Sequence, residues 1–178
     1  NKDEGMLKKQ WRELSEHPGA SVDKKVLTED NVIKAGGPKK GEPHWYYFKE
    51  DGTPASLNSQ ETAVNRAAQK IDGELYFFDP YGCLQTGLVR MTAGNGGQTG
   101  YFGEGRDDAF MHMGKVRDVR DKKGEEREFY FGSTGSAKGV GISGEKDGSL
   151  YKDGALVTAA RGQGYELFEV EGKRYLVN

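Results

Sequence analysis

The chain has 178 residues, of which 27 are glycine and only 34% are hydrophobic, a composition typical of many tight turns rather than of a compact α/β enzyme. Its 26 basic and 28 acidic residues give a net charge of −2 and form no basic stripe, so we expect no nucleic-acid partner. No apolar run approaches the roughly 18 residues that a membrane-spanning helix requires, so we expect no membrane insertion.

The first predicted element is a short N-terminal helix over residues 2–16. Its apolar face is formed by Met6, Leu7, Trp11 and Leu14. His17-Pro18-Gly19 ends this helix, and the polar, Gly- and Pro-containing segment that follows is typical of a linker. We therefore predict an N-terminal helix and linker over 1–40 and a repeat region over 41–178. The chain opens at Asn1 without Met, so we expect it to be a fragment of a longer protein.

From His44 onward the sequence contains short aromatic runs, each followed by a polar turn that ends in Gly. The runs are Trp45–Phe48, Leu75–Phe78, Gly100–Phe102 and Phe129–Phe131. Asp-Gly pairs at 51–52, 72–73, 147–148 and 153–154 favour two-residue type I′ hairpin turns, and Glu171-Gly172 indicates one more hairpin. We predict a mainly β fold of stacked β-hairpin repeats, similar to a solenoid.

The strand pattern explains why such hairpins need neighbours. In Tyr76-Phe77-Phe78, alternation places Tyr76 and Phe78 on one face of the strand and Phe77 on the other. A single two-stranded hairpin is barely stable in water, so each aromatic face must be covered by the next unit. Residues 61–70 leave two alternatives open, a short helix or a strand that leads into the Asp72-Gly73 turn.

Metal and cofactor chemistry is not indicated. Cys83 is the only cysteine, and the histidines at 17, 44 and 112 are scattered without the spacing of metal ligands. We expect no metal and no cofactor, and we interpret Cys83 as a small, semi-buried side chain after a turn.

The segment from Lys70 to Val89 resembles the cell-wall-binding repeat family, which includes choline-binding modules, glucan-binding repeats and the carbohydrate-binding repeats of large bacterial toxins. The match lies in the turn at 71–73, the aromatic run, the second turn at 79–82 and Thr86-Gly87. The other copies are looser, and the resemblance covers about residues 44–178. It implies hairpins that stack in a solenoid, and a protein that is secreted or held at the bacterial cell surface.

The same resemblance argues against choline as the ligand. Choline-binding members hold a quaternary ammonium ion in a cage formed by the aromatic residue after Thr-Gly and the leading aromatic residues of the following runs. The first of these positions holds Leu88, Lys115 and Val140, and the second holds Trp45, Leu75, Thr99 and Glu128. Only Trp45 is aromatic, so the sequence predicts a ring without a partner, and Lys115 would repel a cation.

We expect the last ring of each run to be core and four other rings to be available for a ligand. The predicted core residues are Phe48, Phe78, Phe102 and Phe131. The candidate ligand-binding residues are Trp45, Tyr46, Tyr81 and Tyr101, which lie at run starts or in turns and could present flat rings to sugars.

No catalytic motif stands out. The neighbouring carboxylates Asp107 and Asp108 would point to opposite sides of a strand, and the Gly- and Ser-containing segment at 132–136 does not meet the nucleophile-elbow pattern. The sequence therefore predicts no enzyme but a non-catalytic module that binds a cell-wall polysaccharide or another glycan. The alternative is a structural spacer or protein-interaction module of an adhesin, with every ring used in packing.

Overall fold

The structure is a computed structural model that describes residues 5–16, 18, 41–57, 61, 63–91 and 97–178. Within these residues it is mainly β, with one short helix and two 3₁₀ turns. The strands are β1 (Gln10–Leu14), β2 (His44–Phe48), β3 (Gln69–Ile71), β4 (Glu74–Tyr76), β5 (Leu88–Met91), β6 (Gln98–Tyr101), β7 (Gly114–Arg120), β8 (Glu126–Phe131), β9 (Gly144–Lys146), β10 (Ser149–Lys152), β11 (Ala155–Leu156), β12 (Glu166–Val170) and β13 (Lys173–Val177). The helix is α1 (Val64–Ala67), and the 3₁₀ turns are η2 (Arg106–Asp108) and η3 (Gly135–Ala137).

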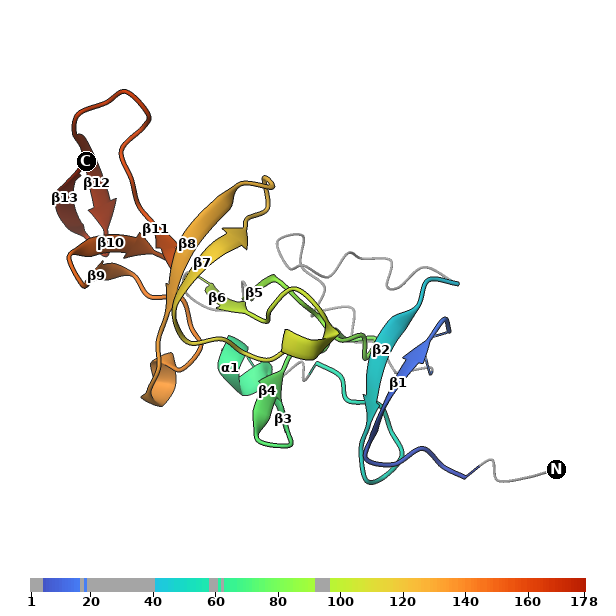
Figure 1. Cartoon of the computed structure of the whole chain (residues 1–178). Coiled ribbons are helices and arrows are strands. Elements are labelled where there is room, and N and C mark those ends of the chain that lie inside the picture. Colours follow the sequence, from blue (N-terminus) through green and yellow to red (C-terminus); the bar gives the residue numbers. More distant parts are fainter. Residues whose placement is uncertain (1–4, 17, 19–40, 58–60, 62, 92–96) are drawn as a thin grey trace.

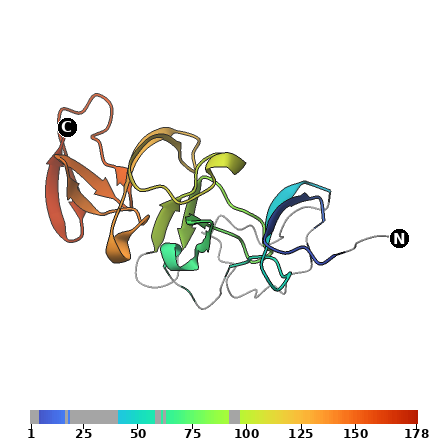
Figure 2. The same ribbon diagram turned by 60° about the horizontal axis from the view of Figure 1, so that its bottom comes forward.

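The strands form a series of antiparallel hairpins along the molecule (Figure 1). The first hairpin is β1–β2, the second β3–β4, the third β5–β6 and the fourth β7–β8. The fourth belongs to a five-stranded sheet in the order β7-β8-β11-β10-β9, and β12–β13 forms the last hairpin. Figure 2 shows from a second direction that the units follow one another from the N-terminal to the C-terminal end. The stacked-hairpin prediction is thus confirmed, while a regular solenoid geometry stays a prediction.

Type I′ turns occur at most of the expected places. Both residues have positive φ at Asp72-Gly73 (50° and 93°), Asp147-Gly148 (51° and 77°), Asp153-Gly154 (49° and 85°) and Glu171-Gly172 (50° and 73°). This combination defines the turn and matches the twist of the flanking strands. At 51–52 only Gly52 has positive φ, and Asp51 instead accepts hydrogen bonds from the backbone and hydroxyl of Thr53. The type I′ prediction is therefore wrong at this one pair.

The predicted N-terminal helix is wrong, because residues 10–14 form a strand. Strand β1 pairs with β2 in a register that places Trp11 opposite Tyr47 and Leu14 opposite His44. The helical spacing of Trp11 and Leu14 did not decide the structure, because strand formation packs the half-buried Trp11 ring against Tyr47, Tyr76 and Phe78. Residues 10–14 belong to the first hairpin. A boundary near residue 40 stays a prediction, because residues 19–40 lie outside the described ones.

Both alternatives for residues 61–70 occur in succession. Val64–Ala67 form α1, whose Val64 and Ala67 are buried, and Gln69–Ile71 form β3. The turn of helix is only four residues long and is held by packing rather than by a side-chain cap. No described helix has the length and apolarity needed to cross a membrane.

The core is divided into four clusters that lie between successive units. Phe78, Tyr76 and Trp11 join the first and second hairpins, whereas Phe77 and Phe102 join the second and third. Tyr101 and Phe131 join the third and fourth. Strand alternation thus directs neighbouring rings into different clusters, as expected for Tyr76, Phe77 and Phe78. Burial of Phe48, Phe78, Phe102 and Phe131, at 6%, 1%, 0% and 0% exposure, confirms the predicted core.

A polar contact also connects the third hairpin with the turn between β10 and β11. The Asp153 carboxylate forms an ion pair with Arg90 of β5 and accepts a hydrogen bond from the Thr99 hydroxyl of β6 at 2.8 Å. Strand β11 then pairs with β8 through Ala155 and Phe129. These contacts fix the segment that leads from β11 towards the last hairpin.

Candidate functional site

The four predicted ligand-binding rings do not gather on one surface. Tyr46 is fully buried and Tyr101 is 6% exposed, so the expectation that they are exposed is wrong. Tyr46 lies on the face of β2 that packs in a cluster with Leu14 and Cys83, and Tyr101 stacks on Phe131 with a centroid distance of 6.2 Å. Position at the start of a run did not expose these rings, because each strand face is covered by another unit.

Tyr81 and Trp45 are half-buried and lie apart from each other. Tyr81 packs against the cluster that contains Tyr46, while strand alternation places Trp45 on the opposite face of β2. Their roles in ligand binding stay predictions. Neither ring lines the open groove described below.

Cys83 lies next to Tyr46, in surroundings that make its thiol unreactive. The Cys83 thiol donates a hydrogen bond to the Tyr46 hydroxyl at 3.3 Å and is 2% exposed. Burial, together with the neighbouring Asp79 carboxylate, raises the pKa of Cys83 to about 12. Asp79 accepts hydrogen bonds from the backbone N–H groups of Tyr81 and Cys83, both at 2.8 Å. This turn is structural, because a thiol nucleophile needs a lowered pKa and access to solvent.

The carboxylate of Asp108 also has a structural role. It accepts hydrogen bonds from the backbone N–H groups of Glu104 and Gly105, at 3.1 and 2.8 Å, and thereby closes the turn that contains η2. Desolvation works against ionisation, but these two donors lower the pKa of Asp108 below its ordinary range. Within the described part of the chain, no group of three or more His, Cys, Asp or Glu side chains could hold a metal ion.

Trp45 has a partner that the sequence did not reveal. Trp11 pairs with Tyr47, the penultimate ring of its run, just as Leu88 pairs with Tyr101 and Lys115 with Tyr130. Trp11 therefore occupies the position that Leu88 and Lys115 occupy in later hairpins, and the expectation of an unpartnered Trp45 is wrong. The guanidinium of Arg106 lies over both indole rings, 3.9 Å from the Trp11 centroid and 5.2 Å from that of Trp45.

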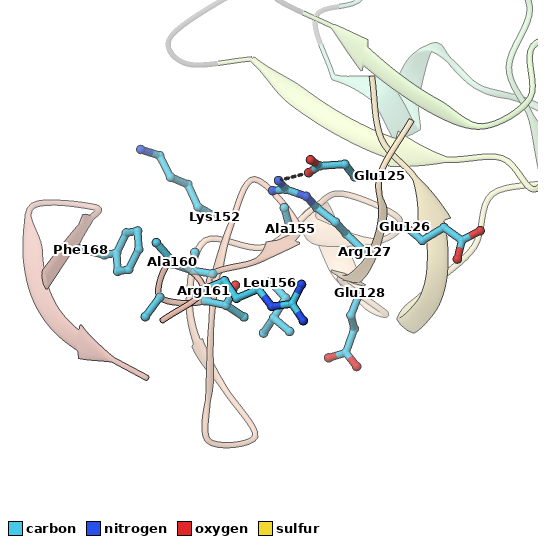
Figure 3. A pocket seen from close by; sticks show the side chains of 13 residues that line it. Glu125, Glu126, Arg127, Glu128, Lys152, Ala155, Leu156, Ala160, Arg161 and Phe168 are labelled. Carbon is cyan, nitrogen blue, oxygen red and sulfur yellow. Dashed lines mark hydrogen bonds and ion pairs between the residues drawn. The ribbon is translucent and has the colours of Figure 1, made fainter. Parts of the chain in front are cut away.

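An open groove lies at the other end of the hairpin series. This charged groove has a volume of about 1000 Å³ and is bounded by residues 125–128 of the fourth hairpin, Lys152, residues 155–161 and Phe168 of the last hairpin. Figure 3 shows the Phe168 ring at one side of the groove and the Arg127 and Glu128 side chains at the other. The 160–166 connection is held to β12 by the Ala160 N–H, which donates to the Glu166 carboxylate at 2.9 Å.

Acidic side chains of the groove are paired with cations. Glu128 accepts a hydrogen bond from the Tyr151 hydroxyl at 2.7 Å and lies 3.3 Å from both Lys115 and Arg117. The Tyr151 hydroxyl, together with Lys115, lowers the pKa of Glu128. Glu126 pairs with Arg120 at 3.5 Å.

Cations of the groove fall into two groups. The Arg127 guanidinium pairs with Glu125 at 2.8 Å and Asp121 at 3.0 Å (Figure 3), and the hydrogen bond that it donates to the Glu125 carboxylate raises the pKa of Arg127. Lys152 and Arg161, by contrast, form no ion pair with another described residue and are exposed. The groove therefore offers two uncompensated positive charges next to one aromatic ring. Sequence reasoning missed this site, because its walls come from three segments that are separate in the sequence, and it is the pairing of β11 with β8 that brings two of them together.

Comparison with known proteins gives structural similarities at low sequence identity. No protein-family model and no curated protein matches the chain. Solved structures similar to it include CbpF in complex with ipratropium, at 18% identity and a TM-score of 0.47 over 94% of this chain and 40% of that chain. Choline binding protein F from Streptococcus pneumoniae, in the presence of a peptidoglycan analogue, gives 19% identity, a TM-score of 0.41 and coverage of 84% and 45%. CbpJ from Streptococcus pneumoniae TIGR4 gives 15% identity and a TM-score of 0.32, over 94% of this chain and 62% of that chain. The chain spans less than two thirds of each of these chains.

Proposed function

We propose that the chain is a non-catalytic module that binds a cell-wall polysaccharide or another glycan, as part of a secreted or surface protein of a bacterium. The observation that carries the proposal is the charged groove, with the Phe168 ring beside the unpaired cations Lys152 and Arg161. A flat ring can stack on the C–H face of a sugar, while lysine and arginine donate hydrogen bonds to hydroxyl, carboxylate or phosphate oxygens. The groove is open, which suits a polymer that extends past both ends.

The Phe168 ring can contact a ligand because it is not part of the packed core. It belongs to none of the four core clusters that the described residues form, and it is half-buried. The cations are suited to a ligand with acidic or phosphate groups, since the three glutamates of the groove are already paired. The preferred ligand is therefore a glycan that carries negative charge.

A binding role fits the chemistry better than catalysis does. Cys83 is buried with a raised pKa, and Asp108 is engaged with backbone N–H groups. Choline is not the expected ligand, because the cage positions of the fourth hairpin hold Lys115 and Glu128, which form an ion pair at 3.3 Å. In the third hairpin the same positions hold Leu88 and Thr99.

The proposal is tested by co-sedimentation of the whole chain with purified Gram-positive cell walls, with and without their covalently attached anionic polymers. We expect retention on the complete walls and weaker retention on the stripped ones. Phe168→Ala and the double variant Lys152→Ala/Arg161→Ala should each weaken retention about tenfold or more, because each removes direct ligand contacts. The matched control is Lys173→Ala/Arg174→Ala, which removes the same charge from exposed positions on β13 outside the groove. Equal loss in the control and the groove variants would contradict the assignment.

A protein-interaction module is the second candidate, and exposed apolar residues of the last hairpin favour it. Leu167 and Leu176 are directly opposite each other on β12 and β13 and are 60% and 68% exposed. Such a cross-strand pair is an apolar contact surface of the kind that another protein covers. If Leu167→Ser abolishes association of the chain with the bacterial surface while Phe168→Ala does not, this second function is the correct one.

A further inference from the structure

Two tryptophans and one arginine meet at the first hairpin. Trp11 and Trp45 lie on the same face of the β1–β2 hairpin. Trp11 is opposite Tyr47, which is two residues from Trp45 on β2, and residues two apart on a strand share a face. They are diagonal cross-strand neighbours, close enough for both rings to contact one group. That group is the Arg106 guanidinium, whose Cζ lies 3.9 and 5.2 Å from the two ring centroids.

Arg106 makes these contacts in place of ordinary polar ones. Its Nε is buried and has no hydrogen-bond partner among the described residues, and no ion pair of Arg106 occurs among them. A buried, unpaired donor is unfavourable. The electron-rich faces of two indoles attract a cation, and this attraction grows when water is excluded. The rings therefore take the place of a carboxylate as the partner of this guanidinium.

The turn that carries Arg106 is built to hold it in place. Gly103 has a φ of 58°, and a Cβ there would collide with the backbone carbonyl of Asp108. The Asp108 carboxylate closes the same turn by accepting from the N–H groups of Glu104 and Gly105. Because both ends of η2 are fixed, Arg106 is directed at the first hairpin from a distant part of the chain.

The equivalent positions elsewhere lack this arrangement. The third hairpin has Leu88 and Thr99 there, and the fourth has Lys115 and Glu128, an ion pair. Of the first, third and fourth hairpins, only the first has aromatic residues at both positions, Trp11 and Trp45, and this pair already holds the Arg106 cation. Weakly hydrated organic cations such as methylated ammonium ions are the class of ligand that two indole faces recognise.

We propose that Arg106 is the resident cation of a Trp11–Trp45 site, and that its guanidinium keeps external quaternary ammonium ions out of that site. The site is distinct from the charged groove, which is lined by residues after position 124, so this proposal does not rest on glycan binding. Removing the side chain of Arg106 opens the aromatic pair to a small methylated cation.

The test uses the whole chain and tetramethylammonium chloride as the probe, with sodium chloride at equal ionic strength as the reference. The chain contains only two tryptophans, both in this site, so its tryptophan emission reports on this site alone. We expect no saturable change for the wild-type chain. Arg106→Ala and Arg106→Gln should each show saturable quenching, with an affinity about tenfold or more above the wild-type limit.

Three further variants decide the interpretation. Arg106→Lys retains a cation and should stay closed, whereas Arg106→Ala/Trp45→Ala should lose the response of the single variant. Equal tetramethylammonium binding by wild type and Arg106→Ala would overturn the proposal. So would a folded Arg106→Gln chain, verified by far-UV circular dichroism, that shows no saturable response. Loss of the fold in both neutral variants would also overturn it, since the guanidinium would then be a required part of the core.

Discussion

Replacing Phe102 by alanine removes a ring that joins the second and third hairpins. Phe102 is fully buried, and its centroid lies 5.5 Å from that of Phe77 in the cluster between these two units. Truncation of a buried phenylalanine costs about 3–5 kcal/mol, which includes the cavity that remains. A domain of this size is stable by only about 5–15 kcal/mol. The variant therefore loses a large part of its free energy of unfolding, and the loss falls at one junction of the series.

Urea denaturation with two probes measures this effect. Tryptophan emission reports on the first hairpin, since Trp11 and Trp45 both lie there, while far-UV circular dichroism reports on all strands. In a linear array, weakening of one interface uncouples the units on either side of it. For Phe102→Ala we expect a lower circular-dichroism midpoint and a separation of the two unfolding curves. Phe168→Ala is the matched control, because the same truncation outside the four clusters should cost about 1 kcal/mol or less. Coincident curves with an unchanged midpoint for Phe102→Ala would refute the reasoning.

Three further predictions concern local contacts. Cys83 should resist alkylation in the native chain, because its pKa of about 12 lowers the thiolate fraction about a thousandfold, and mass spectrometry should show rapid labelling only in denaturant. Glu128→Gln should lower the free energy of unfolding by about 1 kcal/mol at neutral pH. The pKa of Glu128 in the folded chain lies below the ordinary 4.5, so the stabilisation by the Glu128 carboxylate is present above pH 4.5 and is lost as the pH falls through the folded pKa. The stabilities of the two chains, measured by acid unfolding, should therefore converge at low pH. Gly103→Ala should cost more than Gly73→Ala, about 2 against about 1 kcal/mol in thermal unfolding, because both glycines have positive φ but a Cβ at Gly73 meets open space.

The parts of the fold that depend on neighbouring residues could be predicted from the sequence. The aromatic runs lie on or next to the second strands of the first four hairpins, and the Asp-Gly pairs at 72, 147 and 153 form the turns that their conformational preference requires. The burial of Phe78 and Phe102 also follows from local alternation. In each case the signal lies within a few residues of the feature that it specifies.

The parts that depend on distant partners could not be predicted. Trp11 fits a helical pattern as well as a strand, and its assignment depends on pairing with Tyr47 across a long intervening segment. The positions of Tyr46 and Tyr101 in their aromatic runs predict exposed rings, but packing against other units buries both side chains. The contact of Arg106 with Trp11 leaves no local signature at all, since it joins residues far apart in the chain.

The central claim is that the charged groove is the ligand-binding surface, and a map of amide protection tests it most directly. Hydrogen exchange is measured by mass spectrometry on the whole chain, with and without a soluble fragment of cell-wall glycan that carries its anionic polymer. We predict slower exchange in peptides that cover residues 152–161 and 166–170, and little change in the first hairpin. Protection confined to peptides around Trp45 or Tyr81, or no protection anywhere, would contradict the account.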